Sequence, residues 1–367
     1  MKIGVLTSSR ADYGIYKPLL NYLKLDSEIE LQVIAFGMHL QESQGFTISD
    51  IKNDGYEKIL CVGSMPEQDG IYEIAKGYAQ LLGEFVEFWN RNSFDIVLAL
   101  GDRWEMSAAI QASIPFQLKI AHIHGGETTL GSIDNIYRHQ ISLASKLHFT
   151  AAEAFSERVK NLVGTSKGVF TTGSISLDDI ENLKLPEWSK VQEVFQIPFN
   201  DFILVTIHPE TVETIDINEE FALLVYEVLV ELVQTVNILI TKSNSDSFGS
   251  LFNKQFLKIQ NEYPDNVKLV DSLGRLNYFS AMNQCILMLG NTSSGIIEAA
   301  SFKKWVVNIG DRQLGRLRNK NVIDVALNKK KITQTVREII NRKLCVDENK
   351  YKRSNTCLTI INHLKNQ

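Results

Sequence analysis

Short apolar runs rich in β-branched residues recur along the chain and alternate with longer amphipathic stretches. In the first half the apolar runs cover residues 2–7, 31–36, 95–100, 119–123, 146–149 and 169–172. In the second half they cover residues 202–207, 236–240, 267–270, 286–289 and 305–309. Because parallel strands need helical crossovers, this alternation predicts an α/β protein with parallel sheets between helices.

A more polar stretch with two prolines, residues 181–200, separates the two series of runs. A chain of 367 residues is also long enough for two domains. The pattern therefore predicts two Rossmann-like, doubly wound parallel-sheet domains, which we place at residues 1–175 and 176–350. We expect residues 351–367 to form a C-terminal helix, for which packing back on the first domain is one arrangement.

The composition is that of an ordinary soluble protein, with 44% hydrophobic and 22% charged residues. A net charge of −5 argues against binding to nucleic acid or a membrane surface, since both call for a basic patch. The four cysteines are scattered without a CxxC pair, which indicates neither a disulfide framework nor a zinc site. No apolar run resembles a signal peptide or a membrane span. We expect a cytoplasmic protein.

Polar clusters follow several predicted strands, and ligands bind at the carboxyl ends of strands in open α/β sheets. The most informative cluster is Asn-Thr-Ser-Ser-Gly at residues 291–295, between an apolar run and a helix-like stretch. A turn of this kind directs main-chain N–H groups and a helix start at one point, which favours an anion such as phosphate. An ordinary capped helix is the alternative, because Ser and Thr are common N-cap residues.

Two clusters of the first half offer charged groups at strand ends. Arg10 follows the first strand and presents donors suited to phosphate, although a solvated arginine at a helix start is the alternative. Asp102 and Arg103 follow the third predicted strand and place a carboxylate beside a cation. An N-cap aspartate would explain Asp102 equally well.

Residues 122–139 hold more titratable groups than helix capping needs. His122 lies within a strand, and a satisfied core histidine is the favoured interpretation. Glu127 is harder to explain structurally, because the two preceding glycines allow a close approach to substrate. Asp134 and Arg138 are spaced for one helix face, with a surface ion pair as the alternative.

The second half adds a histidine and a basic loop. His208 ends the first strand of this half, and the proline after it restricts it to an extended conformation. A histidine there can transfer protons near neutral pH. Residues 310–316, with two arginines and two glycines, indicate a mobile lid over a diphosphate, or else a solvated basic turn.

Taken in order, these clusters resemble the motifs of the hydrolysing UDP-N-acetylglucosamine 2-epimerases of sialic-acid and legionaminic-acid biosynthesis. The resemblance spans residues 3 to about 325. The motifs are SRADYG at 9–14, GDR at 101–103, HIHGGE at 122–127, ID at 133–134 with RH at 138–139, HPET at 208–211, GNTSSG at 290–295 and GDRQ at 310–313. It implies the GT-B architecture, in which two Rossmann-like domains face a central cleft and the C-terminal one holds the nucleotide.

The resemblance also implies the chemistry. A proton leaves C2 of the sugar, UDP leaves C1, and water adds to the 2-acetamidoglycal with inversion at C2, which gives UDP and a free manno-configured sugar. By resemblance, Asp102, Glu127 and Asp134 carry the proton transfers, with their individual roles unresolved. Arg138 then orients the carboxylates, and His208 serves the leaving diphosphate.

The other residues that the resemblance implies are contacts to the substrate. Arg10, Ser293, Ser294 and Arg312 would hold the diphosphate, and Glu298 would accept from the ribose hydroxyls. The complete set of expected substrate contacts is Arg10, Arg103, His124, Asn244, Asn291, Ser293, Ser294, Glu298 and Arg312. We expect no cofactor and no metal, because cationic side chains can neutralise the diphosphate. A homodimer or homotetramer is expected from the family.

Some alternatives stay open. The sugar could be that of UDP-N-acetylglucosamine or of UDP-N,N'-diacetylbacillosamine. Several relatives carry a carboxylate where His124 stands, so proton handling would be shared differently in this chain. A non-hydrolysing epimerase, a GT-B glycosyltransferase and a non-catalytic nucleotide-sugar binding protein are the other functions considered. By resemblance, the His-Pro-Glu-Thr motif favours a hydrolysing over a non-hydrolysing epimerase. The dense acidic cluster argues against a glycosyltransferase.

Overall fold

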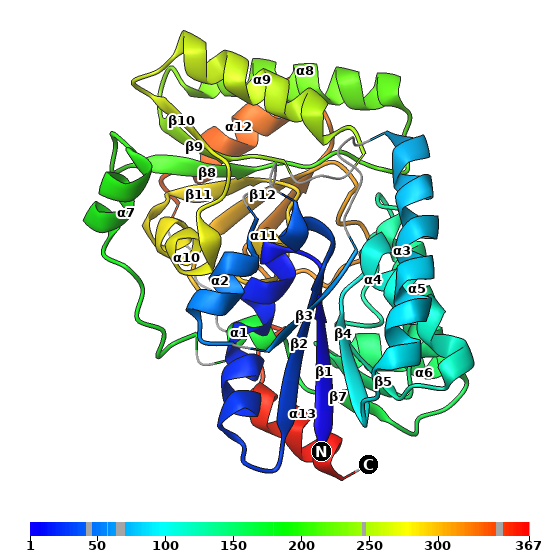
Figure 1. Cartoon of the computed structure of the whole chain (residues 1–367). Coiled ribbons are helices and arrows are strands. Elements are labelled where there is room, and N and C mark those ends of the chain that lie inside the picture. Colours follow the sequence, from blue (N-terminus) through cyan, green and yellow to red (C-terminus); the bar gives the residue numbers. More distant parts are fainter. Residues whose placement is uncertain are drawn as a thin grey trace. The chain divides into compact units, whose positions relative to one another are not determined.

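The computed structural model describes residues 1–41, 46–56, 58–63, 70–178, 180–243, 247–342 and 348–366. It contains two compact units, each built on one parallel sheet (Figure 1). Unit 1 comprises Met1–Glu127, Asp134–Ile180 and Tyr351–Gln367, and unit 2 comprises Thr128–Ile133 and Glu181–Lys350. Neither unit is therefore a single continuous segment of the chain.

Unit 1 holds a seven-stranded sheet in the order β3-β2-β1-β4-β5-β6-β7. Its strands are β1 (Lys2–Thr7), β2 (Glu30–Phe36), β3 (Ile59–Val62), β4 (Ile96–Leu100), β5 (Ile120–Ile123), β6 (Leu147–Thr150) and β7 (Val169–Thr171). Its α-helices are α1 (Arg10–Leu25), α2 (Ile48–Asn53), α3 (Ile71–Arg91), α4 (Trp104–Ser113), α5 (Asp134–Ala144), α6 (Glu153–Val163) and α13 (Thr356–Lys365). Short 3₁₀ turns are η1 (Gly37–Leu40), η3 (Ile114–Phe116) and η4 (Ile175–Leu177).

Unit 2 holds a six-stranded sheet in the order β10-β9-β8-β11-β12-β13. Its strands are β8 (Phe202–Thr206), β9 (Asn237–Thr241), β10 (Val267–Val270), β11 (Leu287–Gly290), β12 (Trp305–Ile309) and β13 (Val322–Val325). Its helices are α7 (Trp188–Phe195), α8 (Ile215–Leu232), α9 (Gly249–Glu262), α10 (Gly274–Gln284), α11 (Ser293–Ile297) and α12 (Lys329–Ile339).

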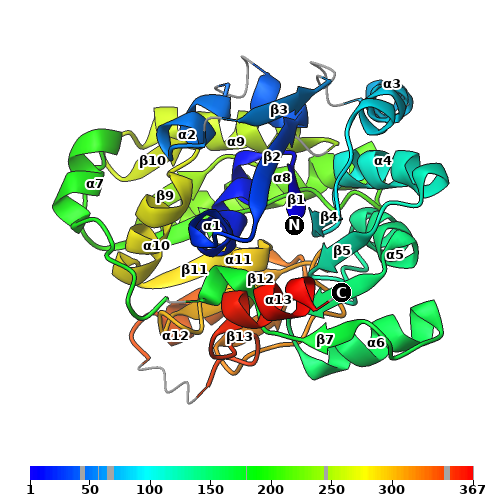
Figure 2. The same ribbon diagram turned by 60° about the horizontal axis from the view of Figure 1, so that its bottom comes forward.

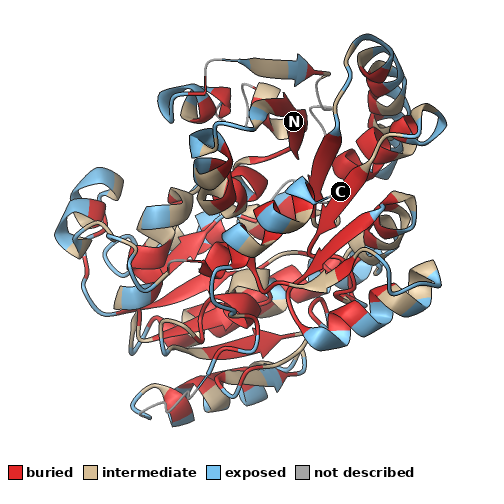
Figure 3. Ribbon diagram, turned by 90° about the horizontal axis from the view of Figure 1, so that it is seen from below, coloured by how far each residue is buried: buried red, intermediate tan, exposed pale blue. Residues whose placement is uncertain are grey.

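The central strands are buried on both faces, which explains why they appear in the sequence as unbroken apolar runs (Figure 3). All strand pairs are parallel, with Val5 opposite Val33 in unit 1 and Leu289 opposite Val205 in unit 2. The hydrophobic pattern does not predict β3 and β13. Both are four-residue edge strands with partly exposed side chains, so burial does not impose an apolar run on them.

The helices cover the sheets with apolar faces at helical spacing. In α3, Leu81, Phe85 and Trp89 recur every four residues and are buried in a core cluster of unit 1. These three side chains therefore belong to the core of unit 1. Within the described ranges, no helix combines the length and apolarity needed to cross a bilayer.

The C-terminal helix α13 belongs to unit 1, where it packs against α1 (Figure 2). Ile360 and Leu364 are fully buried in the same core cluster as the strands β1 and β4. The Asp178 carboxylate accepts the main-chain N–H groups of Thr356 and Cys357, at 3.1 Å each. A carboxylate at this point satisfies donors that the first turn of a helix leaves unpaired.

Candidate functional site

The order of the strands locates the loops that can carry a site. The direction of winding reverses between β1 and β4 in unit 1, and between β8 and β11 in unit 2. Ligands of doubly wound sheets bind at the carboxyl ends of the strands beside such a reversal. Arg10 and Asp102 follow the two strands in unit 1, and His208 and Asn291 follow those in unit 2. These four predicted site residues therefore lie in the loops where the strand order favours ligand binding.

In unit 1, Arg138 joins two of the predicted acids. It lies on α5 with only 2% of its surface exposed. Its Nη1 donates to the main-chain carbonyl of Glu127 at 2.8 Å, and its Nη2 forms an ion pair with Oδ2 of Asp102. Asp134 begins the same helix one turn earlier. One buried guanidinium thus fixes the loops after β4 and β5 relative to each other.

The loop after β5 also joins His124 to Glu127. His124 Nδ1 lies 2.6 Å from Glu127 Oε1, and both side chains are buried. The backbone of His124 is left-handed, with φ at 65°, which turns the chain directly after the strand. Gly126 has φ at 77°, and a Cβ there would lie 2.2 Å from the carbonyl oxygen of Phe155. Close packing against α6 therefore requires this glycine.

His122 is a satisfied core histidine, as the sequence favours. Its ring nitrogens lie 2.9 Å from Ser142 Oγ and 2.8 Å from the carbonyl oxygen of Gly101. Burial lowers the pKa of His122 to about 3. The neutral ring therefore supports the Gly101 turn that precedes Asp102.

Arg103 is held by a buried acid that the sequence analysis does not single out. Glu105 Oε1 accepts from Nε and Nη2 of Arg103, at 3.2 and 3.0 Å. Glu105 is completely buried, and burial raises its pKa. Asp12 lies nearby and accepts from the Ser8 hydroxyl at 2.6 Å, and burial raises its pKa too. Glu105 therefore binds the Arg103 guanidinium directly, and Asp12 interacts with it electrostatically.

Arg10 forms an ion pair with an acid of α2. Its Nε lies 3.2 Å from Oδ2 of Asp50, at the surface of unit 1. Both side chains are about two-fifths exposed, with fractions of 39% and 42%. An exposed pair of this kind is weak, so Arg10 can exchange this partner for a phosphate at little cost.

In unit 2, two asparagine side chains hold the main chain around Pro209. Asn291 Oδ1 accepts from the N–H of His208 at 2.7 Å, and its Nδ2 donates to the carbonyl of His208 at 2.8 Å. Asn218 makes the same pair of bonds to Glu210, both at 3.0 Å. The His208 ring itself lies 3.3 Å from Ser243 Oγ through Nδ1. Asn291 is fully buried, so it acts on any ligand through the position of His208.

The basic loop after β12 is anchored to the same region of unit 2. Arg312 donates to the carbonyl of Pro209 at 2.5 Å, and Gln313 donates to that of Asn291 at 2.8 Å. Glu210 accepts the N–H of Asp311 at 2.5 Å, and burial raises the pKa of Glu210. Because Arg312 and Gln313 are buried, the loop is not a solvated basic turn.

The run at 291–295 lies beside a chain of hydroxyl groups. Ser294 Oγ is 2.8 Å from the Tyr278 hydroxyl, which is 3.4 Å from Thr206 Oγ1. Burial raises the pKa of Tyr278 to about 12, which keeps it protonated and able to donate. The helix that follows, α11, has only five residues, so any anion at this run would depend on hydroxyls and main-chain N–H groups more than on a helix dipole. Glu298 lies buried directly after α11.

Residues 128–133 come from the loop between β5 and α5 but pack within unit 2. The N–H of Leu130 donates to the carbonyl of Leu314 at 3.0 Å, and that of Ile133 donates to Thr211 Oγ1 at 3.1 Å. A Cβ on Gly131 would lie 2.6 Å from main-chain atoms of Arg312. This six-residue segment, which lies between Glu127 and Asp134 in the sequence, therefore packs against the loop that carries Arg312.

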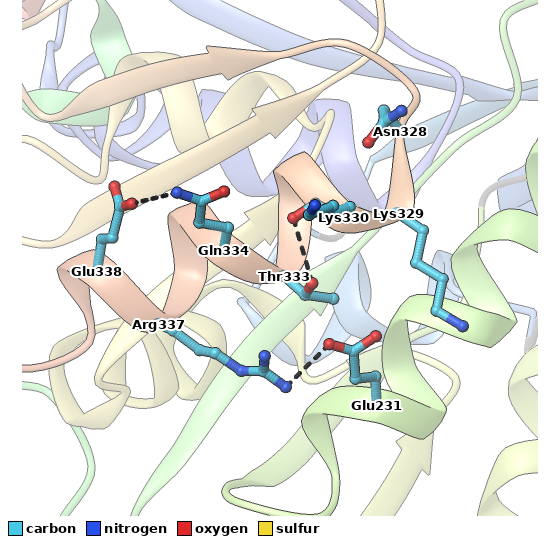
Figure 4. Close-up of a pocket in the computed structure, with 8 residues that line it drawn as sticks. All are labelled: Glu231, Asn328, Lys329, Lys330, Thr333, Gln334, Arg337 and Glu338. Carbon is cyan, nitrogen blue, oxygen red and sulfur yellow. Dashed lines mark hydrogen bonds and ion pairs between the residues drawn. The ribbon is translucent and has the colours of Figure 1, made fainter.

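Two further results limit the site. The predicted contact Asn244 lies outside the described residues. Across the part of the chain that the structure describes, no three His, Cys, Asp or Glu side chains group as metal ligands. A surface groove between α8 and α12 is lined by ordinary charged side chains, including the Arg337–Glu231 ion pair at 2.9 Å, and by none of the predicted site residues (Figure 4).

Several residues of these networks are not among the predicted site residues, although most of them carry a signal in the sequence. Glu210 and Gln313 stand inside the quoted motifs, and Ser174, which contacts His124, follows a predicted strand as the other clusters do. Glu105 lies within a helix, where an acidic residue gives no hint of burial. Tyr278 has no signal, because its partner Ser294 is 16 residues away in the sequence.

Comparison with known proteins gives a family and named relatives. A family described as "UDP-N-acetylglucosamine 2-epimerase" matches residues 21–365. The chain is 33% identical over 336 residues to "Polysialic acid biosynthesis protein P7" of Escherichia coli, with 91% of this chain and 85% of that protein covered. It is 35% identical over 348 residues to "UDP-N,N'-diacetylbacillosamine 2-epimerase (hydrolyzing)" of Legionella pneumophila, with 93% and 89% covered.

A solved structure has the same fold. The UDP-GlcNAc 2-epimerase of Methanocaldococcus jannaschii, in complex with UDP-GlcNAc and UDP, superposes with a TM-score of 0.82 over the full length of both chains, at 17% identity. At this identity the likeness concerns the fold alone. It confirms the predicted GT-B-like class with two Rossmann-like parallel-sheet domains.

Proposed function

The chain belongs to the UDP-N-acetylglucosamine 2-epimerase family and is therefore an enzyme that acts on a UDP-sugar, and we propose that it hydrolyses its substrate. The products would be UDP and the free 2-epimeric sugar, formed through a 2-acetamidoglycal. The 35% identity to a relative named as hydrolysing supports this choice over an epimerase that returns a nucleotide-linked product. The proposed substrates are UDP-N-acetylglucosamine and UDP-N,N'-diacetylbacillosamine.

The observation that carries the proposal is the contact of one buried guanidinium with the Asp102 carboxylate and with the loop that carries Glu127. Arg138 binds the carboxylate of Asp102 and the main chain of Glu127. Epimerisation with hydrolysis moves protons at C2 twice, once in elimination and once in hydration. It therefore needs more than one positioned acid or base. We propose that Asp102, Glu127 and Asp134 share these transfers, with Arg138 as the group that orients them.

The groups of unit 2 suit the departing nucleotide. We propose that His208 assists the leaving diphosphate, and that Ser293, Ser294 and Arg312 bind it. In the elimination the C2–H and C1–O bonds break. The electron pair of the C2–H bond forms the C1–C2 double bond, and the electron pair of the C1–O bond leaves with UDP. Water then supplies a hydroxyl to C1 and a proton to C2. Arg10, Arg103 and Glu298 are the remaining proposed substrate contacts.

Proton NMR in D₂O with each UDP-sugar in parallel tests the proposal. We expect UDP release together with a free, manno-configured sugar that carries deuterium at C2. A product still linked to UDP would assign the chain to the non-hydrolysing enzymes instead. UDP binding without turnover of either sugar would favour a binding protein, and transfer to an added acceptor sugar would favour a glycosyltransferase.

The biological setting is proposed from the relatives. We propose a place in nonulosonic acid synthesis, of the sialic or legionaminic type; the name of the Escherichia coli relative, which mentions polysialic acid biosynthesis, supports the sialic type. We also propose a cytoplasmic homodimer or homotetramer. Light scattering coupled to gel filtration measures the oligomeric state directly, and a monomer at all concentrations would contradict it.

A further inference from the structure

Glu127, His124 and Ser174 form one buried chain of hydrogen bonds in unit 1. His124 Nδ1 is 2.6 Å from Glu127 Oε1, and His124 Nε2 is 3.2 Å from Ser174 Oγ. Ser174 Oγ is in turn 3.0 Å from Ser176 Oγ. The exposed fractions of Glu127, His124 and Ser174 are 1%, 8% and 0%. An acid, an imidazole and a hydroxyl are thus aligned away from solvent.

The backbone fixes both ends of this chain. The main-chain N–H of His124 donates to Phe149 at 3.0 Å, and the carbonyl of Glu127 accepts from Arg138. The N–H of Ser174 donates to the carbonyl of Tyr351 at 2.8 Å, in the segment that leads into α13. Strand β6, helix α5 and the segment before α13 therefore hold the main chain of these three residues in place.

A serine hydroxyl suits this position because it can donate or accept by rotating. When His124 is neutral with its proton on Nδ1, it donates to Glu127 and its Nε2 accepts from Ser174. When the ring is doubly protonated, Nε2 donates to Ser174 instead. If the ring proton moves to Nε2, a protonated Glu127 can donate to Nδ1. Each protonation state keeps both ring nitrogens bonded, which avoids the cost of an orphaned polar group in the interior.

We propose that Ser174 and His124 are positioning residues that form a proton relay behind Glu127, so that the buried acid can gain and lose a proton during turnover. The proposal rests on the proposed function. When Glu127 takes a proton from the sugar, an O–H bond forms and the C2–H bond breaks. The electron pair of the C2–H bond becomes the C1–C2 double bond, and the electron pair of the C1–O bond leaves with the diphosphate. The hydrogen bonds of His124 and Ser174 can change direction when Glu127 gains the proton, and they change back when Glu127 returns it.

Other charged groups face this relay and must be counted in any pH experiment. His122 on β5 lies close enough to interact electrostatically with His124. Arg138 on α5 donates to the main chain of Glu127, and Arg158 on α6 donates to the carbonyl of Gly126 at 3.4 Å. These two cations are present in every variant below, so differences between variants report on the relay.

The test compares Ser174→Ala with Ser113→Ala, which remove two buried hydroxyls of unit 1. Ser174 contacts His124, whereas Ser113 donates to the main-chain carbonyl of Ile110 at 2.7 Å. Ser174→Ala is expected to lower kcat about tenfold with KM changed less than twofold, and to shift the pH profile of kcat. Ser113→Ala should stay within twofold of wild type with the same pH profile. His124→Asn retains a donor towards Glu127 but cannot take up a proton, so it should lose about a hundredfold in kcat and one limb of the profile.

A second measurement needs no turnover. Nitrogen-proton correlation spectra of the histidine rings, with His124 assigned by its loss in His124→Asn, should show the Nδ1–H tautomer in wild type and a changed ring state in Ser174→Ala. Equal kinetics and pH profiles for Ser174→Ala and Ser113→Ala, or an unchanged ring state, would overturn the relay. Absence of turnover in wild type, with UDP still bound, would instead overturn the proposed function.

Discussion

The side-chain amide of Asn291 pairs with both main-chain polar groups of His208, accepting at 2.7 Å and donating at 2.8 Å. The two residues follow β11 and β8, which are neighbours in the sheet of unit 2. An asparagine therefore takes the place of a further strand residue and extends the pairing beyond the end of β8. The imidazole of His208 is placed by this pair, not by the local sequence alone.

Asn291→Ala should reduce kcat by about 10- to 100-fold, because His208 loses both main-chain partners. The buried polar groups left unpaired should also cost about 1–3 kcal/mol of unfolding free energy. A double-mutant cycle with His208→Ala separates the two effects. If Asn291 acts through His208, the double variant should have the kcat of His208→Ala alone. Full additivity of the two losses would contradict that dependence.

Arg138→Met should abolish most activity and destabilise unit 1. It removes the cation that binds Asp102 and the donor to Glu127, in a position that is almost fully buried. Breaking such a pair leaves an uncompensated carboxylate, which typically lowers the free energy of unfolding by about 3 kcal/mol. The loss should be smaller here, because Asp102 is partly exposed and solvent screens its charge. Arg138→Lys keeps the charge but cannot serve both partners. It should recover stability more than kcat, as measured by denaturant unfolding and UDP release.

Glu105→Gln should separate affinity from stability. Glutamine retains a carbonyl acceptor for Arg103 but loses the charge, so the hold on the guanidinium weakens and KM should rise roughly five- to tenfold. Burial raises the pKa of Glu105, which means that the fold disfavours its charged form. Removing the acid should therefore leave the melting temperature at neutral pH unchanged or higher. A large fall in melting temperature with an unchanged KM would assign Glu105 a purely structural role.

Gly131→Ala should weaken UDP binding, since its Cβ would lie 2.6 Å from main-chain atoms of Arg312 and force the loop to move. A cost of about 1–3 kcal/mol is expected for overpacking of this kind. Gly83→Ala in α3 is the matched control, because a Cβ there meets nothing within 4 Å. In a helix interior that change should be neutral or stabilising by up to about 1 kcal/mol. Calorimetric titration with UDP and thermal unfolding distinguish the two variants.

Buried histidines should make unit 1 sensitive to acid. Burial lowers the pKa of His39 and His148 to about 4 and that of His122 to about 3. In acid the folded state then binds fewer protons than the unfolded state. The stability that these neutral histidines contribute is therefore fully present above pH 6.5, and it is lost as the pH falls towards their folded-state pKa values. At pH 5 each of these histidines would lower the free energy of unfolding by about 2 kcal/mol relative to neutral pH. The raised pKa values of Asp12 and Glu105 act in the opposite direction.

His122→Gln isolates one such contribution. Unfolding free energy measured from pH 7 to pH 5 should fall less steeply in the variant than in wild type, by the share of one histidine. Equal slopes would mean that His122 is not held neutral in the fold.

The sequence predicts the central strands and the loops that carry the site, because burial on both faces and position at strand ends both leave local patterns. The contacts inside the site leave no such pattern. Asn291 is 83 residues from His208, and Ser174 is 50 residues from His124, so only the folded sheet order brings them together. The pairing of Arg10 with Asp50 and the burial of Glu105 are likewise invisible in a single sequence.

The place of α13 in unit 1 determines the order in which the chain can fold during synthesis. Ile360, Ile361 and Leu364 fill part of the core around β1 and β4, yet they follow the whole of unit 2 in the chain. A ribosome therefore delivers every residue of unit 2 before the residues that complete unit 1. We expect the unit that begins first to finish last, and to depend on chaperones until its final helix emerges.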